Sequence, residues 1–489
     1  MEIQFEERPV RYLCRTAWGE KTVEETAEIK LPGQDTQPGQ ILGAWGQPCL
    51  TEKHWADGSV SVSGGVTVWV LLRAMDGVQS VPGWVPFRQS WELHDSQRDG
   101  KVIVRCSLKG VDARMTGAGK LIITAQISLY LQALETCTAN RYVAEHIPED
   151  IYLQRKCVSA TVPVESGEKR VSMEEMISPS QPMETVLYYR LEPEVSECRV
   201  MGDKLVFRGE VCLCALCQGE NEGTFVSRTS FPVSQYIQLD GDYGSKAIGD
   251  VIPVVLSAEA EKTEDGQIAF RGNVLWQYVL HDEIEIDTIM DVYSNQRSVE
   301  AEIARLCIPA LCAREKGQQE VACVFAAENG TVVDCAVMSA CAEWDDRTGK
   351  LQQEGAARVL YYDGEHVLQS ALLPFSVETA AEQEDGGYCV VAWQCSPEVM
   401  SEAQDGINIR IPYLLYTMDE RSQRCCKGFS SEDEMSRSDN RPCLILRRAN
   451  GEDLWSLAKA SGSSETAIRR ANGLEGCPEK GKMLIIPVE

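Results

Sequence analysis

The segments KLVFRG at 204–209, SFPVSQYI at 230–237 and GQIAFRG at 266–272 decide the fold of most of this chain. Apolar and polar residues alternate in and around them, with the period of two that is typical of β-strands with one buried face. In the middle segment, Pro232 stands between Phe231 and Val233. We therefore expect an apolar strand, a strand marked by proline and a further strand, in this order.

The same three features occur three times in the first 440 residues. The prolines follow one another at intervals of 146 and 142 residues, in Val85-Pro86-Phe87, Phe231-Pro232-Val233 and Leu373-Pro374-Phe375. About twenty residues before each proline, a glycine precedes an apolar strand, at Gly65, Gly209 and Gly355. About 35 residues after each proline a second strand begins, at Leu121, Ile268 and Ile407. Recurrence at a nearly fixed spacing predicts three copies of one structural unit.

Asp-Gly dipeptides interrupt the alternation, as expected for hairpin turns. They are Asp57-Gly58, Asp76-Gly77, Asp99-Gly100, Asp265-Gly266, Asp363-Gly364 and Asp405-Gly406. Each copy is thus predicted to be an all-β module, a sandwich or a strongly curled sheet. We place the copies at residues 1–140, 171–293 and 300–425, with boundaries near 142–170 and 294–301.

The last segment, residues 442–489, predicts a different, α+β fold with the order strand, helix, helix, strand. A strand opens at Ile445, Asn450-Gly451 supplies a turn, and a helix begins at Leu454 with Asp453 as its N-cap. Ser463 or Ser464 starts a second helix, which ends at Asn472-Gly473. Residues 484–486 return as a strand. The polar segment 430–441 before this domain is predicted to be a flexible linker.

The charge of the chain excludes broad electrostatic binding to nucleic acid or to anionic lipid. The net charge is −27, whereas both of these partners favour an excess of Lys and Arg. Residues 442–489 differ, because seven basic residues outweigh six acidic ones there. The acidic N-terminus lacks the features of a signal peptide, and no apolar run reaches the length of a membrane helix. We therefore expect a cytoplasmic protein.

The residues that carry chemistry give no positive sign of an enzyme, a metal or a cofactor. Five histidines are scattered without ligand spacing, and the densest thiol group, Cys212, Cys214 and Cys217, lacks the second close pair of a zinc site. The 20 cysteines have no regular spacing, so we expect reduced thiols. Phosphate-binding loops and nucleophile elbows are absent from the sequence. An acid pair of the glycosidase type stays open, because the 74 acidic residues place many carboxylates together by chance.

The C-terminal segment resembles a LysM domain in three runs, 450–458, 468–474 and 481–487. This resemblance implies binding of N-acetylglucosamine-containing glycans, as in peptidoglycan, in a groove between the first and last loops. The chain departs from the family pattern at Gly451-Glu452-Asp453, where a hydroxyl residue is usual. Leu454, Trp455, Leu457, Ala458, Ile468 and Ile485 are expected in the core. The candidate partner-binding or glycan-binding residues are Gly451, Glu452, Asp453, Arg469, Arg470 and Asn472.

The three copies resemble the SPOCS domain of spore-coat proteins, most clearly at residues 202–281. Several such domains before a LysM domain form the layout of the SipL type of spore-coat morphogenetic protein. The resemblance implies a mother-cell protein recruited to the forespore surface and the spore coat. It further implies that the LysM domain contacts a coat-morphogenetic ATPase similar to SpoIVA, or other coat proteins.

Three hypotheses follow. In the first, the chain is a non-enzymatic scaffold for spore-coat assembly whose tail recruits a protein. In the second, the tail binds peptidoglycan or a similar glycan. In the third, for which the sequence offers least, the chain is an enzyme that acts on such a glycan. The altered residues Glu452 and Asp453 and the lack of an export signal favour the first hypothesis.

Overall fold

The computed structural model describes the chain except for residues 1, 32–38, 75–76, 94–99, 117–118, 221–222, 326–330, 340–342, 346–347, 381–387, 395–397, 404–405, 433–441 and 489. β-Strands make up most of the described chain, and two short helices lie near its C-terminal end. The prediction of a mainly all-β fold is therefore confirmed. The helices span eight residues each, and no described helix is long and apolar enough to cross a membrane.

The first unit consists of two antiparallel sheets that pack face to face. One has the order β2-β7-β6 and the other the order β3-β4-β5. Their bounds are Glu6–Lys30 (β2), Gln40–Ala56 (β3), Ser59–Ala74 (β4), Gly77–Glu92 (β5), Lys101–Thr116 (β6) and Lys120–Val143 (β7). Val62 and Val66 of β4 share one buried core with Leu121 and Ile123 of β7, as in a β-sandwich.

The second unit repeats this plan with sheets β11-β12-β8 and β9-β10. Its strands are Ile151–Ile177 (β8), Met183–Gly219 (β9), Thr224–Tyr243 (β10), Ile248–Lys262 (β11) and Ile268–Ser294 (β12). The long β9 turns back at Gly202, where φ is 63°. Strand β8 begins at Ile151, which pairs with Ser294, whereas we expected this unit to begin at residue 171. The segment 142–170, interpreted as a boundary, thus contains the first half of a strand.

The third unit has the same connectivity. Strand β20 pairs with β13 and also with β18, β19 and β1, while β16 pairs with β14, β15 and β17. The bounds are Glu2–Gln4 (β1), Val299–Val324 (β13), Thr331–Ser339 (β14), Glu343–Asp345 (β15), Lys350–Tyr362 (β16), Leu368–Ala380 (β17), Tyr388–Gln394 (β18), Glu398–Ala403 (β19) and Gly406–Ser431 (β20). Ser430 and Ser431, which we placed in the linker, end β20. Glu432 donates its N–H to Ser298 O at 3.2 Å, and the remaining residues of the expected linker, 433–441, lie outside the described residues.

The prolines that marked the repeat occupy equivalent strands. Each proline lies in an edge strand of the sheet to which it belongs. There, the missing N–H group of proline removes no hydrogen bond to a further strand. These strands are β5, β10 and β17, with Pro86, Pro232 and Pro374. The predicted strands after each proline are also equivalent, since they open β7, β12 and β20.

The recurring glycine has a steric reason. A Cβ atom at Gly209 would collide with the carbonyl oxygen of Glu194, and one at Gly355 would meet Met338 O at 2.6 Å. In the first unit the equivalent residue is Gly64, whose Cβ would collide with Cys49 O, and not its neighbour Gly65 used in the sequence comparison. Two strands therefore approach too closely at this point for any residue except glycine.

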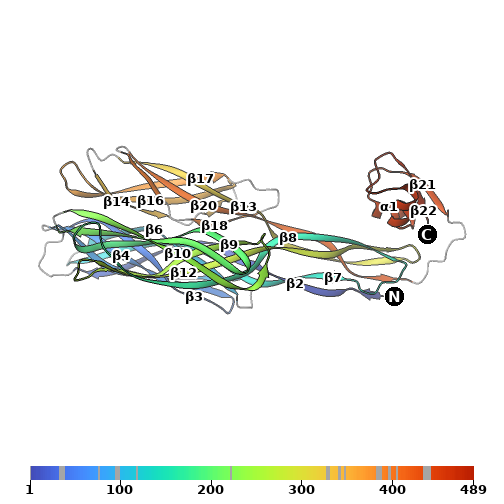
Figure 1. Cartoon of the computed structure of the whole chain (residues 1–489), viewed down its shortest axis with the longest axis horizontal. Helices are drawn as coiled ribbons and strands as arrows, with labels where there is room; N and C mark the ends of the chain where they lie inside the picture. The colour runs from blue at the N-terminus through green and yellow to red at the C-terminus, as the bar shows by residue number, and fades with distance from the viewer. Residues whose placement is uncertain are drawn as a thin grey trace.

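The three units lie side by side along one elongated body (Figure 1). The paired strands β2–β7, β8–β12 and β13–β20, which we call the three ribbons, share apolar cores that draw side chains from all of them. Leu134, Val279 and Met418, one from each unit, belong to one such core. As a result, β7 is buried without interruption from Ile127 to Leu134, as expected for a strand covered on both faces.

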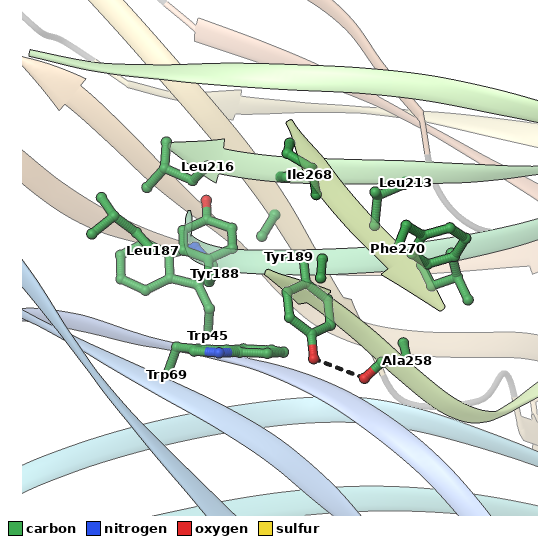
Figure 2. Close-up of a cluster of buried hydrophobic side chains, with 14 of the residues drawn as sticks. Trp45, Trp69, Leu187, Tyr188, Tyr189, Leu213, Leu216, Ala258, Ile268 and Phe270 are labelled. Atoms are coloured by element: carbon green, nitrogen blue, oxygen red, sulfur yellow. Dashed lines mark hydrogen bonds between the residues drawn. The ribbon is translucent and has the colours of Figure 1, made fainter. Parts of the chain in front are cut away.

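Trp45 of the first unit contacts residues of both other units. Its ring stacks on Tyr188 of the second unit with centroids 5.0 Å apart, and Arg358 of the third unit lies 5.6 Å from the ring. Nearby, Trp69 and Tyr189 make an edge contact at 4.5 Å (Figure 2). Trp45 is only 2% exposed. These aromatic contacts join the units into one hydrophobic core.

The C-terminal module, residues 442–488, has the expected order of elements: β21 (Leu444–Arg448), α1 (Leu454–Ser461), α2 (Glu465–Asn472) and β22 (Met483–Pro487). Asp453 caps α1 and Ser464 caps α2, as predicted. Gly462 and Gly473 end the helices with φ values of 61° and 60°, a conformation that glycine adopts without strain. The module lies beside the end of the ribbons that is close to the chain N-terminus (Figure 1).

Candidate functional site

The first three predicted site residues lie between β21 and α1. Gly451 has a φ of 92° and makes the turn that Asn450-Gly451 indicated. Glu452 Oε1 accepts a hydrogen bond from Arg447 Nη2 at 2.6 Å. Asp453 Oδ1 accepts from the N–H of Ser456 at 2.7 Å, and Asp453 Oδ2 accepts from the hydroxyl of the same serine at 3.1 Å. Both carboxylates therefore make contacts within the module, while Glu452 Oε2 is buried and has no hydrogen-bond partner among the described residues.

The other three predicted site residues end α2. Asn472 Nδ2 donates to Ile485 O at 2.6 Å, and Ile485 N donates back to Asn472 Oδ1 at 2.7 Å. This amide thus closes the outer edge of β22 like an added strand. Arg469 Nη1 donates to Glu475 O at 3.2 Å, whereas Arg470 is exposed. Arg470 is the better placed of the two arginines to meet a partner.

The structure adds an exposed apolar surface that the sequence analysis missed. It consists of Leu444, Leu446, Met483 and Ile485, which are 46, 64, 57 and 39% exposed, and we call it the strand face. In the antiparallel pair, Leu446 lies directly across from Ile485. The prediction that Ile485 belongs to the core is wrong, because Leu484 and Ile486 on either side of it are the buried residues.

The reason for the error is that both faces of these strands are apolar. Period-two alternation identifies a buried face only when the other face is polar. Ile445 of β21 and Leu484 and Ile486 of β22 point toward the core of the module. Equally apolar residues of the same two strands point outward. The run of four apolar residues at 483–486 was the signal that could have revealed the strand face.

The opposite side of the module docks on the end of the second ribbon. Trp455 Nε1 donates to Asp291 Oδ2 at 2.9 Å, and Lys459 Nζ lies 2.8 Å from both oxygens of the same carboxylate. Tyr293 packs edge-on against Trp455 at 4.7 Å and donates from its hydroxyl to Ser463 O at 2.8 Å. The expected core placement of Trp455 is confirmed, although part of its cover comes from β12.

Asp291 is the ionised centre of this contact. Burial raises the pKa of its carboxyl group, but the hydrogen bonds from Lys459 and Trp455 lower the pKa by more, so that the net shift is downward. The carboxylate consequently carries its charge at neutral pH and holds two donors of the module at once. The contact fixes the module on the body through α1 and leaves the strand face uncovered.

The described cysteines and acids do not form a metal site. No group of three or more potential ligands occurs within the described ranges. Burial raises the pKa of the Cys214 thiol to about 11 and that of Cys217 to about 12, as expected for unreactive buried thiols. Cys14 and Cys137, on the paired strands β2 and β7, are joined in a disulfide. The expectation of reduced thiols is wrong for this pair, because the antiparallel register brings their Cα atoms to 5.9 Å.

Comparison with known proteins gives no relative from which a role can be transferred. No family model matches the chain. The curated proteins give no match. The solved structures give none either.

Proposed function

We propose that this chain is a non-enzymatic scaffold of the SipL type in bacterial spore-coat assembly. In this proposal the C-terminal module, as a LysM domain, recruits a SpoIVA-like coat-morphogenetic ATPase at the forespore surface. The observation that carries the proposal is the strand face. Four large apolar side chains lie together in the open on a module of fewer than fifty residues, and such a surface is typical of a protein interface.

The contacts of the predicted groove favour a protein ligand over a sugar. Glycan recognition needs polar groups that are available to hydroxyl and amide groups of the ligand. Here Glu452 is paired with Arg447, Asp453 caps α1, and Asn472 is bonded to β22. The strand face, in contrast, offers apolar area, and Arg470 in the last turn of α2 offers an exposed charge that suits an acidic partner.

The test is the affinity of the full chain for the purified ATPase, measured by titration calorimetry. Leu446→Glu places a charge in the centre of the strand face and should weaken binding at least about tenfold. Met201→Glu is the matched control, because Met201 of β9 is also 64% exposed but lies in the second unit. Equal affinities of the two variants would reject the strand face as the binding surface.

A second titration of the same full chain uses a soluble N-acetylglucosamine oligomer. Binding of the ATPase without the sugar supports the scaffold. Binding of the sugar without the ATPase would instead make the C-terminal module a glycan-binding domain of the spore or cell envelope. In that case Arg470→Gln and Leu446→Glu, measured with the oligomer, locate the sugar on or away from the strand face.

A further inference from the structure

A cleft between the first and second ribbons is unlike the rest of this acidic chain. It has a volume of about 170 Å³, several times what one water needs, and three arginines line it: Arg8, Arg141 and Arg155. Tyr142, Val143, Asp287, Thr288 and Ile289 complete the lining. The chain as a whole carries a net charge of −27, so a cleft with three cations and one acid stands out.

Two of these arginines face each other across one ribbon. Arg8 of β2 and Arg141 of β7 are direct cross-strand partners, and like charges in this position destabilise a sheet unless an anion intervenes. Arg8 is compensated by Glu6, whose carboxylate lies 3.0 Å from Nη2, and by Glu145. For Arg141, no acid within the described part of the chain forms an ion pair with the guanidinium.

The cleft also contains a buried donor without a partner. The Nε atom of Arg141 is buried and has no hydrogen-bond partner among the described residues. Arg155 uses one Nη atom on Ala144 O at 3.3 Å, which turns its guanidinium toward the first ribbon. Donors that lose water without gaining an acceptor are costly, and an oxyanion would satisfy them together.

Asp287 neutralises only part of the cleft. Its carboxylate is exposed and is the one acid among the residues that line the cleft, whereas the lining holds three guanidinium groups. Its cross-strand partner is Cys157. The lining therefore keeps an excess of positive charge for an anionic ligand.

We propose that this cleft binds a phosphate group, held by Arg141 and Arg155, with Arg8 as a further donor. Guanidinium groups offer paired N–H donors that match the geometry of a tetrahedral oxyanion. The site joins the first two units, so an occupied cleft would also bridge their ribbons. The proposal is independent of the strand face and of the scaffold function.

The test measures the full chain with inorganic phosphate, against chloride at equal ionic strength, by calorimetric titration and thermal unfolding. Phosphate should raise the melting temperature, because it binds the folded state. Arg141→Gln should abolish this rise and weaken binding at least tenfold. In chloride alone the same variant should be at least as stable as the parent chain, because the repulsion between Arg8 and Arg141 is removed.

Arg11→Gln is the matched control, since Arg11 is exposed on the same strand and its side chain alternates to the opposite face from Arg8. It should keep the full response. If Arg141→Gln fails to fold, Arg155→Gln is tested in its place and should likewise lose phosphate binding. Glycerol 3-phosphate, a phosphate monoester, is titrated in parallel with inorganic phosphate. Tighter binding of the monoester indicates that the site takes the phosphate group of a larger molecule, and tighter binding of inorganic phosphate indicates a free anion. No response to either compound, or an equal response in Arg141→Gln and Arg11→Gln, overturns the proposal.

Discussion

His281 lies among the three ribbons, with 1% of its surface exposed. Its ring stacks on Tyr416 at 5.6 Å, and neither ring nitrogen has a hydrogen-bond partner within the described ranges. Burial, together with the charges of Arg15 and Arg314, lowers the pKa of this imidazole to about 3. The nearby acid, Asp250, is already occupied by Arg314 and the Tyr416 hydroxyl. The structure thus holds His281 neutral.

We predict that His281 makes the fold sensitive to mild acid. Its pKa is lower in the folded state than the ordinary value of 6.5, so the unfolded chain takes up the proton first as the pH falls. Between about pH 7 and about pH 5 the free energy of unfolding should drop by about 2 kcal/mol from this group. Urea unfolding at both pH values measures the loss.

His281→Phe keeps a ring in the same space and should remove this part of the pH dependence. The control is His54→Gln, because His54 is exposed on β3. If the Phe variant loses as much stability between the two pH values as the parent chain, the effect belongs to other groups.

The elements themselves follow largely from local sequence. The proline and glycine markers led to equivalent strands, and Asp453, Ser464 and Gly473 delimit the two helices as predicted. The local sequence pattern does not reveal which exposed face of a helix or strand packs against another element. The docking of α1 on β12 depends on Asp291 and Tyr293, which lie more than 150 residues before Trp455 and have no sequence signal of their own. The six candidate site residues lie in the loop before α1 and at the end of α2, but the strand face was not predicted.

We predict that Trp455→Ala both unfolds the C-terminal module and releases it from the body. Removal of a buried aromatic side chain costs roughly 3–5 kcal/mol, and the N–H bond to Asp291 is lost as well. Amide hydrogen exchange of residues 444–487 and of β12 near Tyr293 should increase together.

Trp455→Phe separates the two effects. It keeps a ring against Tyr293 but removes the donor to Asp291, so exchange should rise at the docking contact while the module core stays protected. Unchanged protection in Trp455→Ala would refute the core placement of this residue.

At the scale of the whole molecule, the three units are not independent domains, because they share hydrophobic cores. The main core of the second unit contains Trp45 and Trp69 from the first unit and Leu360 from the third. The sequence showed three copies, but a period of two within each copy carries no information about contacts between copies. A partial signal was present in residues 127–134 of β7, where Tyr130 and Leu134 add large apolar side chains to the face opposite the apolar one.

We predict that the three units unfold as one. Asp334 of the third unit is fully buried and binds Arg190 and Tyr188 of the second unit. Asp334→Ala removes the buried partner of Arg190 and leaves only the partly exposed Glu192 beside its charge, and breaking such a buried pair costs roughly 3–5 kcal/mol. Thermal unfolding followed by calorimetry and by tryptophan fluorescence should shift downward as a single transition for all three units.

Glu174→Gln is the control for charge removal, because the Arg271–Glu174 pair is 68% and 74% exposed and contributes little. If Asp334→Ala split the transition into an early step of the third unit and an unchanged step of the others, the units would fold independently.

The pairing of β1 with the end of β20 has a consequence for how the molecule is made. Glu2 lies opposite Ser430, and Phe5 packs near Phe429, so the beginning of the chain completes a sheet of the third unit. On the ribosome, the first strand therefore waits until almost the whole body has been synthesised. At about 5–20 residues per second, the interval is roughly 20–90 s, during which Ile3 and Phe5 stay without their final neighbours. The strand at residues 2–4 thus reaches its final place only after residues 428–430 have been made.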